Sequence, residues 1–122
     1  MDTESFRSHC IVKKGVTEEF PFGENVLVYK VMGKMFALAD MEDFNSINLK
    51  VDPEMGIELR ERYTSVQEAY HMNKKHWITV LVDGKIPDKL IRQWIDNSYD
   101  LVKSGLTKSI RARLEALERQ GT

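Results

Sequence analysis

The sequence predicts an α+β fold, in which an antiparallel sheet of about five strands is flanked by helices in the order α-β-β-β-α-β-β-α-α. Two observations support this prediction. Apolar runs of strand-like composition follow one another at short intervals, and segments with helical spacing lie before, between and after them. The chain has 122 residues, which suits one hydrophobic core better than two. We therefore expect a single domain over residues 1–122, with the last few residues frayed.

The first helix is expected over residues 3–14, because Phe6 and Cys10 are four positions apart and share one face. Gly15 is expected to end it. Cys10 is the only cysteine of the chain, so it cannot form an internal disulfide, which is typical of a reducing compartment. On a buried stripe a free cysteine usually behaves as a small apolar side chain.

The next segment is expected to be a loop over residues 16–23, followed by a β-hairpin. Within the loop, Phe20-Pro21-Phe22-Gly23 combines a fixed φ with two aromatic side chains, and we expect it to turn while anchoring itself in the core. Residues 26–32 and 35–39 are the two expected strands, joined by a turn at Gly33-Lys34.

A third strand and a helix are expected after the hairpin. Residues 46–51 alternate apolar and polar side chains, as in a strand with one packed and one solvated face. Asp52-Pro53-Glu54 begins a helix that extends to about Tyr63, because an acidic N-cap precedes a proline at the first helical position. Residues 64–70 form a polar connection that could include a short edge strand.

The last third of the chain predicts one strand and two helices. The strand covers residues 77–82, and Ile86-Pro87-Asp88 begins the longest helix, which Gly105 ends. Thr107 is expected to cap a final helix. Strands connected by such short turns form an antiparallel meander, and no linker or repeat interrupts the pattern.

Charge is distributed unevenly along the chain, although the net charge is only −1. Residues 1–43 contain eight acidic and five basic side chains, whereas residues 71–113 contain four acidic and nine basic ones. The whole molecule is therefore not strongly attracted to nucleic acid or to an anionic membrane. The apolar runs are far shorter than the ~20 residues of a membrane helix, and residues 1–7 do not resemble a signal peptide. We expect a cytoplasmic protein with no membrane partner.

Neither a metal site nor a catalytic site can be assembled from the spacing of reactive residues. His71 and His76 are five apart, which places them on opposite faces of a strand and about 140° apart on a helix. Asp96 and Asp100 share a helical face, where such a pair is usually solvated. Cys10 has only scattered histidines as possible bases, and no glycine-rich phosphate loop is present. We expect no metal, no cofactor and no enzymatic activity.

One segment, Tyr70-His71-Met72-Asn73-Lys74-Lys75-His76-Trp77, combines basic and aromatic side chains before an apolar strand. Its lysines and His76 can donate hydrogen bonds to phosphate oxygens, and its rings offer flat faces for stacking. Trp77 begins an apolar strand, where such a ring more often belongs to the core than serves as a stacking platform. Lysines at two turns could add backbone contacts in the manner of wings. The candidate DNA-binding residues are thus Lys34, Lys74, Lys75, His76 and Lys85.

A second interpretation is a protein-interaction or small-ligand-binding module. In that case residues 70–77 would line a groove between the sheet and a helix. Stabilisation by a metabolite or peptide, but not by DNA, would favour this interpretation over DNA binding.

The order of these segments resembles the MmcQ/YjbR family over nearly the whole chain. The segment of residues 70–77 is its most distinctive match. The other matching stretches are Phe20-Pro21-Phe22-Gly23, Val28-Tyr29-Lys30-Val31, Gly33-Lys34-Met35-Phe36-Ala37, Leu49-Lys50-Val51-Asp52-Pro53-Glu54 and Ile95-Asp96-Asn97-Ser98-Tyr99-Asp100-Leu101-Val102.

This resemblance implies a CyaY-like, or frataxin-like, fold and a bacterial protein that binds DNA in a proposed double-wing mode. Frataxin-like domains with an iron-binding role carry an acidic ridge on the first helix. Here the first helix has Asp2 and Glu4 followed by Arg7, Lys13 and Lys14, so an iron-binding role is disfavoured. An expected consequence of DNA binding is an affinity that falls steeply with salt.

Overall fold

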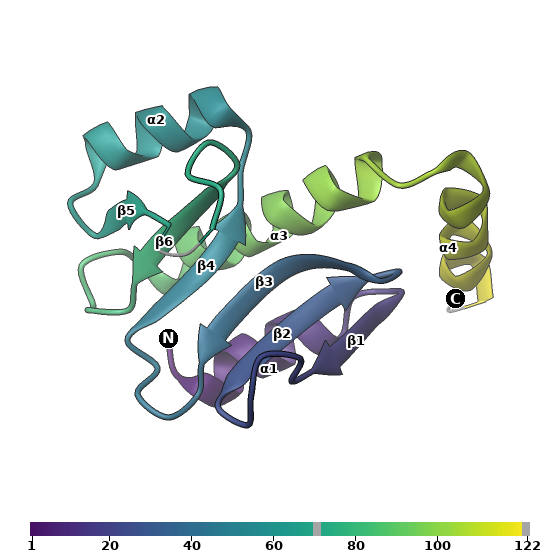
Figure 1. The fold of residues 1–122 in the computed structure, drawn as a ribbon, viewed down its shortest axis with the longest axis horizontal. Helices are drawn as coiled ribbons and strands as arrows, with labels where there is room; N and C mark the ends of the chain where they lie inside the picture. Colours follow the sequence, from purple (N-terminus) through teal and green to yellow (C-terminus); the bar gives the residue numbers. More distant parts are fainter. Residues whose placement is uncertain (70–71, 121–122) are drawn as a thin grey trace.

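The computed structural model describes residues 1–69 and 72–120, and within them a twisted antiparallel sheet runs through the molecule (Figure 1). The strand order is β1-β2-β3-β4-β6-β5. The strands are β1 (Val16–Glu19), β2 (Val26–Val31), β3 (Lys34–Asp40), β4 (Ser46–Lys50), β5 (Val66–Glu68) and β6 (Trp77–Leu81). The helices are α1 (Thr3–Ile11), α2 (Pro53–Arg62), α3 (Asp88–Ser104) and α4 (Lys108–Gln120).

The predicted α+β class and the β2-β3-β4 meander are confirmed, but the described sheet has six strands rather than about five. The additional strand is β1, from a segment that was expected to be a loop. Its sequence is polar, and it pairs only with β2 at the edge of the sheet. The expected anchoring of the following aromatics is wrong: Phe20 is 51% and Phe22 61% exposed.

The hairpin between β2 and β3 turns one residue earlier than expected. Val31 pairs with Lys34, so the turn consists of Met32 and Gly33, which both have positive φ (49° and 87°). This backbone is typical of a two-residue type I′ hairpin, which suits the right-handed twist of the strands. Lys34 is consequently the first residue of β3 rather than part of the turn.

The core lies between one face of the sheet and the helices α1 and α3, which are behind the sheet in Figure 1. Helix α1 contributes Phe6 and Cys10, both fully buried, and it ends at Ile11 rather than at 14. Helix α3 buries the apolar stripe Ile91, Trp94, Ile95, Tyr99 and Val102. The opposite face of the sheet carries no helix in the described structure.

The remaining elements match their sequence signals. Strand β4 buries Ile47 and Leu49 and turns its other side chains to the open face, as the alternation predicts. Helix α2 begins at Pro53 and packs against the β5–β6 edge. Thr107 accepts a hydrogen bond from the Ile110 amide (3.4 Å) at the start of α4. None of the helices in the described part of the chain is both long enough and apolar enough to cross a membrane.

Candidate functional site

The topology brings several basic side chains from separate segments to one end of the sheet. Strand β3 begins at Lys34, β4 ends at Lys50 and β6 begins at Trp77; Lys50 pairs directly with Trp77. Strand β4 lies between β3 and β6, but it pairs with β3 only through Ala37–Ala39, so Lys34 lies three residues beyond the last β3–β4 pair. We call this end of the sheet the basic end, defined by Lys34, Lys50, Lys74, Lys75 and His76.

The segment before β6 is held as a tight turn, which exposes its side chains. The Asn73 side chain accepts a hydrogen bond from the Lys75 amide (2.9 Å), and the His76 amide donates to the Asn73 carbonyl (3.2 Å). The His76 carbonyl in turn accepts from the Val51 amide (2.8 Å), which ties the turn to the end of β4. Lys74, Lys75 and His76 are all exposed. The backbone is therefore fixed while three side chains remain available to a ligand.

The lysines of the basic end are largely free of competing carboxylates. Within residues 1–69 and 72–120, Lys34, Lys50 and Lys75 take part in no ion pair. Lys74 lies 3.7 Å from Glu68, and both side chains are more than half exposed. Such a surface pair contributes only about 0–1 kcal/mol, so a phosphate can replace Glu68 as its partner.

Lys85 does not join the other candidate residues, because it follows β6 at the opposite end of the sheet. There its amide donates to Asp83 (3.0 Å), which also accepts from the Ser65 hydroxyl (2.7 Å). The hydrogen bond from Ser65 is the main cause of a lowered pKa of Asp83, and the hydrogen bond from the Lys85 amide lowers this pKa further. This end also carries Asp40, the last residue of β3, and Glu24, Glu42 and Asp43 in the turns. We call it the acidic end.

The aromatic members of the segment contribute less than its lysines. Trp77 is only 8% exposed and is not a free stacking platform. Tyr70 and His71 lie outside the described residues. Lys50 was not among the sequence-based candidates. It occupies a polar position in the alternating apolar and polar pattern of β4, and this signal could have identified it.

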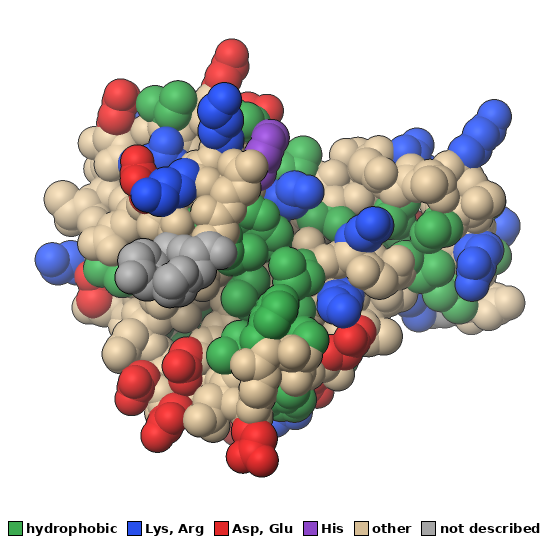
Figure 2. Space-filling view, in the orientation of Figure 1, with side chains coloured by type: hydrophobic (Ala, Val, Ile, Leu, Met, Phe, Trp, Pro, Cys, Tyr) green, Lys and Arg blue, Asp and Glu red, His purple; other side chains and the backbone are tan. Residues whose placement is uncertain are grey.

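The open face of the sheet contains a groove of about 480 Å³ between the two charged ends. Figure 2 shows this face: apolar side chains gather in its middle, acidic ones lie along the lower edge, and lysines and arginines lie to the right and, together with further acidic side chains, at the top. The lining residues are Phe22, Val26, Met35, Leu38, Ala39, Asp40, Ser46, Asn48, Met72 and Asn73. From residues 70–77 this groove is lined by Met72 and Asn73, and it lies on the open face rather than between the sheet and a helix as expected.

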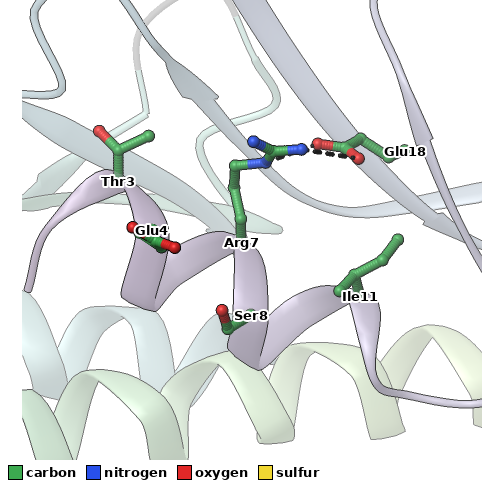
Figure 3. A pocket seen from close by; sticks show the side chains of 6 residues that line it. All are labelled: Thr3, Glu4, Arg7, Ser8, Ile11 and Glu18. Carbon is green, nitrogen blue, oxygen red and sulfur yellow. Dashed lines mark hydrogen bonds and ion pairs between the residues drawn. The ribbon is translucent and has the colours of Figure 1, made fainter.

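A second hollow, of about 540 Å³, lies beside α1 and has a different character (Figure 3). Its central charges neutralise one another, because Arg7 donates to both carboxylate oxygens of Glu18 (2.9 and 3.3 Å). Thr3, Glu4, Ser8 and Ile11 complete the lining. With Glu4 as its other charged group, this hollow has no feature that attracts an anion.

The sequence-based candidates for catalysis have structural roles. Burial raises the pKa of the Cys10 thiol to about 12, so the thiol is protonated at neutral pH and is a poor nucleophile. Asp96 binds His9 on α1 (2.7 Å) and Lys13 just after α1 (2.5 Å). Asp100 is exposed and does not join this cluster. Among the described residues no three histidine, cysteine, aspartate or glutamate side chains converge as a metal site.

Asp96 ties α1 and the segment that follows it to α3 through these two contacts, and the ion pairs make a testable contribution to stability. Partial burial acts to raise the pKa of Asp96, but the hydrogen bonds from Lys13 and His9 outweigh it, so the pKa lies below its usual value near 3.8. Asp96→Asn is expected to lower the free energy of unfolding at pH 7 by about 0.5–1 kcal/mol, the range for partly exposed pairs.

The pH dependence of this effect follows from the sign of the shift. A carboxyl with a lower pKa in the folded state stabilises the fold above its unfolded pKa, and the stabilisation is lost as the pH falls through the folded pKa. Urea denaturation should therefore show the difference between wild type and Asp96→Asn at pH 7 and a smaller difference at pH 3. Asp100→Asn, on the same helix, is the control. An equal loss at both pH values would contradict the ion-pair assignment.

The fold and the site together define a small α+β protein with an open, partly apolar sheet face between a basic and an acidic end. The model of the YjbR family matches residues 12–101. The chain belongs to this family. It is 40% identical over 96 residues to the uncharacterized protein YbdF of Escherichia coli O157:H7, covering 78% of this chain and 79% of that one. It is 30% identical over 118 residues to the uncharacterized protein YjbR of Escherichia coli K12, covering 96% and 100% of the two chains.

Solved structures agree with the fold. A crystal structure of the Deinococcus radiodurans protein DR2400, a DUF419 domain, superposes with a TM-score of 0.86 at 42% identity, covering 93% of this chain and 88% of that one. A crystal structure of a Pseudomonas syringae protein gives a TM-score of 0.71 at 30% identity, covering 83% and 98%. The predicted membership of the MmcQ/YjbR family and the predicted fold class are thus confirmed.

Proposed function

We propose that this protein binds DNA through its basic end, without catalysing a reaction, by donating hydrogen bonds to backbone phosphates. The observation that supports this proposal most strongly is that Lys34, Lys50 and the 74–76 turn, from three segments, lie at the same end of the sheet. Lysines act as point charges toward phosphate, without reading bases. We place this activity in the bacterial cytoplasm, which contains the DNA. Cys10 is buried and forms no disulfide, as is typical of proteins in this reducing compartment.

The charge distribution limits the affinity and the direction of approach. The net charge of −1 gives no long-range attraction. Asp52 and Glu54, at the start of α2, follow directly after β4 and border the basic end. DNA is therefore expected to approach from the open face and to bind with an affinity typical of non-specific contacts, with Kd on the order of 10⁻⁴–10⁻⁶ M.

A salt titration tests the proposal. With phosphate contacts from three of the four lysines of the basic end, the slope of log affinity against log salt is expected near −2.7, so a rise from 50 to 200 mM lowers the affinity about 40-fold. Fluorescence anisotropy of a labelled duplex of mixed sequence measures this directly. Absence of binding at 50 mM salt, or a slope near zero, would contradict phosphate recognition.

A second candidate function is a protein-interaction or small-ligand-binding module. The groove on the open face favours it, because a volume of about 480 Å³ falls in the usual range for ligand sites and Met72 and Asn73 line it. A thermal-shift screen distinguishes the two functions. Stabilisation by a metabolite or peptide, with none by DNA, would support the module and contradict DNA binding.

A further inference from the structure

We propose that the groove on the open face receives an unpaired base from the DNA strand that is held at the basic end. This inference rests on the proposed function and goes further, because it specifies the chemical form of the ligand: a strand with at least one base that is not paired. The groove would contact this base, while the lysines contact the phosphates on either side of it.

The first support is the continuity of the groove with the basic end. Asn73 lines the groove and directly precedes Lys74, and Met35 lines it at the start of β3. A strand whose phosphates contact Lys74 and Lys75 therefore has its next chemical groups at the entrance of the groove. A paired base inside a duplex cannot reach this entrance, since its faces are stacked and its edge is hydrogen-bonded to its partner.

The second support is the apolar surface with an exposed ring. The side chains of Val26, Met35 and Leu38 lie on the open face, and Phe22 is 61% exposed beside them. Such an exposed ring is unusual for a core-forming residue and suits stacking on a base. Stacking on aromatic rings tolerates every base, because each base has a π-face. An apolar floor with an accessible ring thus fits the faces of a base.

The third support is a pair of amide side chains whose donors are unused. The Thr79 hydroxyl donates to the side-chain oxygen of Asn48 (2.6 Å), and the side-chain oxygen of Asn73 accepts from the Lys75 amide (2.9 Å). Both oxygens are thereby occupied, and the NH₂ groups of Asn48 and Asn73 make no hydrogen bond within the described residues. Two donors fit the carbonyl oxygens on the edges of thymine and guanine.

The acidic end limits how much of a strand the groove can hold. Asp40 lines the far end of the groove, and Glu42 and Asp43 follow it in the next turn. Phosphates that ran the whole length of the groove would meet these carboxylates and be repelled. The groove is thus suited to one or two bases that enter from the basic end, with the backbone remaining outside.

The experiment compares two single strands of equal length and equal phosphate number: an oligothymidine strand, and the same strand with abasic sites in its central half. Anisotropy titrations are made with wild type, Phe22→Ala and Phe20→Ala. Phe20 is the matched control, since it is a similarly exposed phenylalanine two residues away that does not line the groove.

Wild type is expected to bind the thymidine strand about tenfold more tightly than the abasic strand. Phe22→Ala should lose most of this preference, with unchanged affinity for the abasic strand, and Phe20→Ala should behave as wild type. Equal binding of both strands by wild type, or equal effects of the two substitutions, would overturn the inference while leaving DNA binding intact.

Two other outcomes separate the remaining explanations. Absence of binding to either strand would contradict the proposed function itself. A change in sedimentation coefficient on Phe22→Ala, without a change in DNA affinity, would identify the open face as a contact between two copies of the chain and overturn the base-binding assignment.

Discussion

Replacing Lys34 and Lys75 together with glutamate is expected to weaken duplex DNA binding about 100-fold at 50 mM salt. The two lysines come from different segments, and neither loses an ion pair on substitution, at least among the described residues. Two unit charges 5 Å apart in water interact by about 0.8 kcal/mol. Reversing a charge replaces attraction by equal repulsion, so two reversals change the binding free energy by about 3 kcal/mol, or about two orders of magnitude in Kd. Anisotropy titration measures this loss, and an unchanged circular dichroism spectrum shows that the fold is intact.

The largest effect on stability is expected for Ser98→Ala on α3. Ser98 is fully buried; its hydroxyl donates to the Phe36 carbonyl (2.5 Å) and accepts from the Lys50 amide (2.9 Å). Both backbone groups lack a strand partner, because Phe36 is skipped at the β2–β3 bulge and the β3–β4 pairing ends at Leu49. Removing the hydroxyl leaves two buried polar groups unpaired, at a cost of about 1–3 kcal/mol each. We expect a loss of about 3 kcal/mol in the free energy of unfolding, measured by urea denaturation.

Ser104→Ala is the matched control for this substitution. Ser104 lies on the same helix, is exposed, and donates only to the Leu101 carbonyl of its own helix (2.7 Å). Its replacement is expected to change stability by less than about 0.5 kcal/mol. Similar losses for the two variants would show that the bridge between β3 and β4 is not the reason for the effect.

The sequence was sufficient for most of the fold, because most elements have a strong local signal. The alternation in β4, the Asp52-Pro53 start of α2 and the Gly105 end of α3 each place an element within one or two residues. Strand β1 has no such signal: Val16–Glu19 is short and polar, and it forms a strand only because the exposed edge of β2 offers hydrogen bonds. The exposure of Phe20 and Phe22 is likewise invisible in a sequence, where two aromatics beside a proline are typical of a core anchor.

The site was predictable only in part, because its assembly depends on strand order. The lysines of residues 74–75 are evident in the sequence, and they are exposed as expected. That β6 lies beside β4, and so brings these lysines to the same end of the sheet as Lys34, follows from long-range pairing that no local pattern encodes. The same pairing places Lys85 at the acidic end, although its position after a strand resembles that of the other candidates.

The central claim is that DNA binds at one end of the sheet rather than to positive charge in general. The most direct test compares the DNA affinities of two variants with the same change in charge: Lys34→Glu with Lys75→Glu, and Lys85→Glu with Lys89→Glu. All four lysines are exposed, and none has an ion pair within the described residues. The first variant is expected to bind at least tenfold more weakly than the second at 50 mM salt. Equal affinities of the two variants would contradict the assignment of the basic end as the binding site.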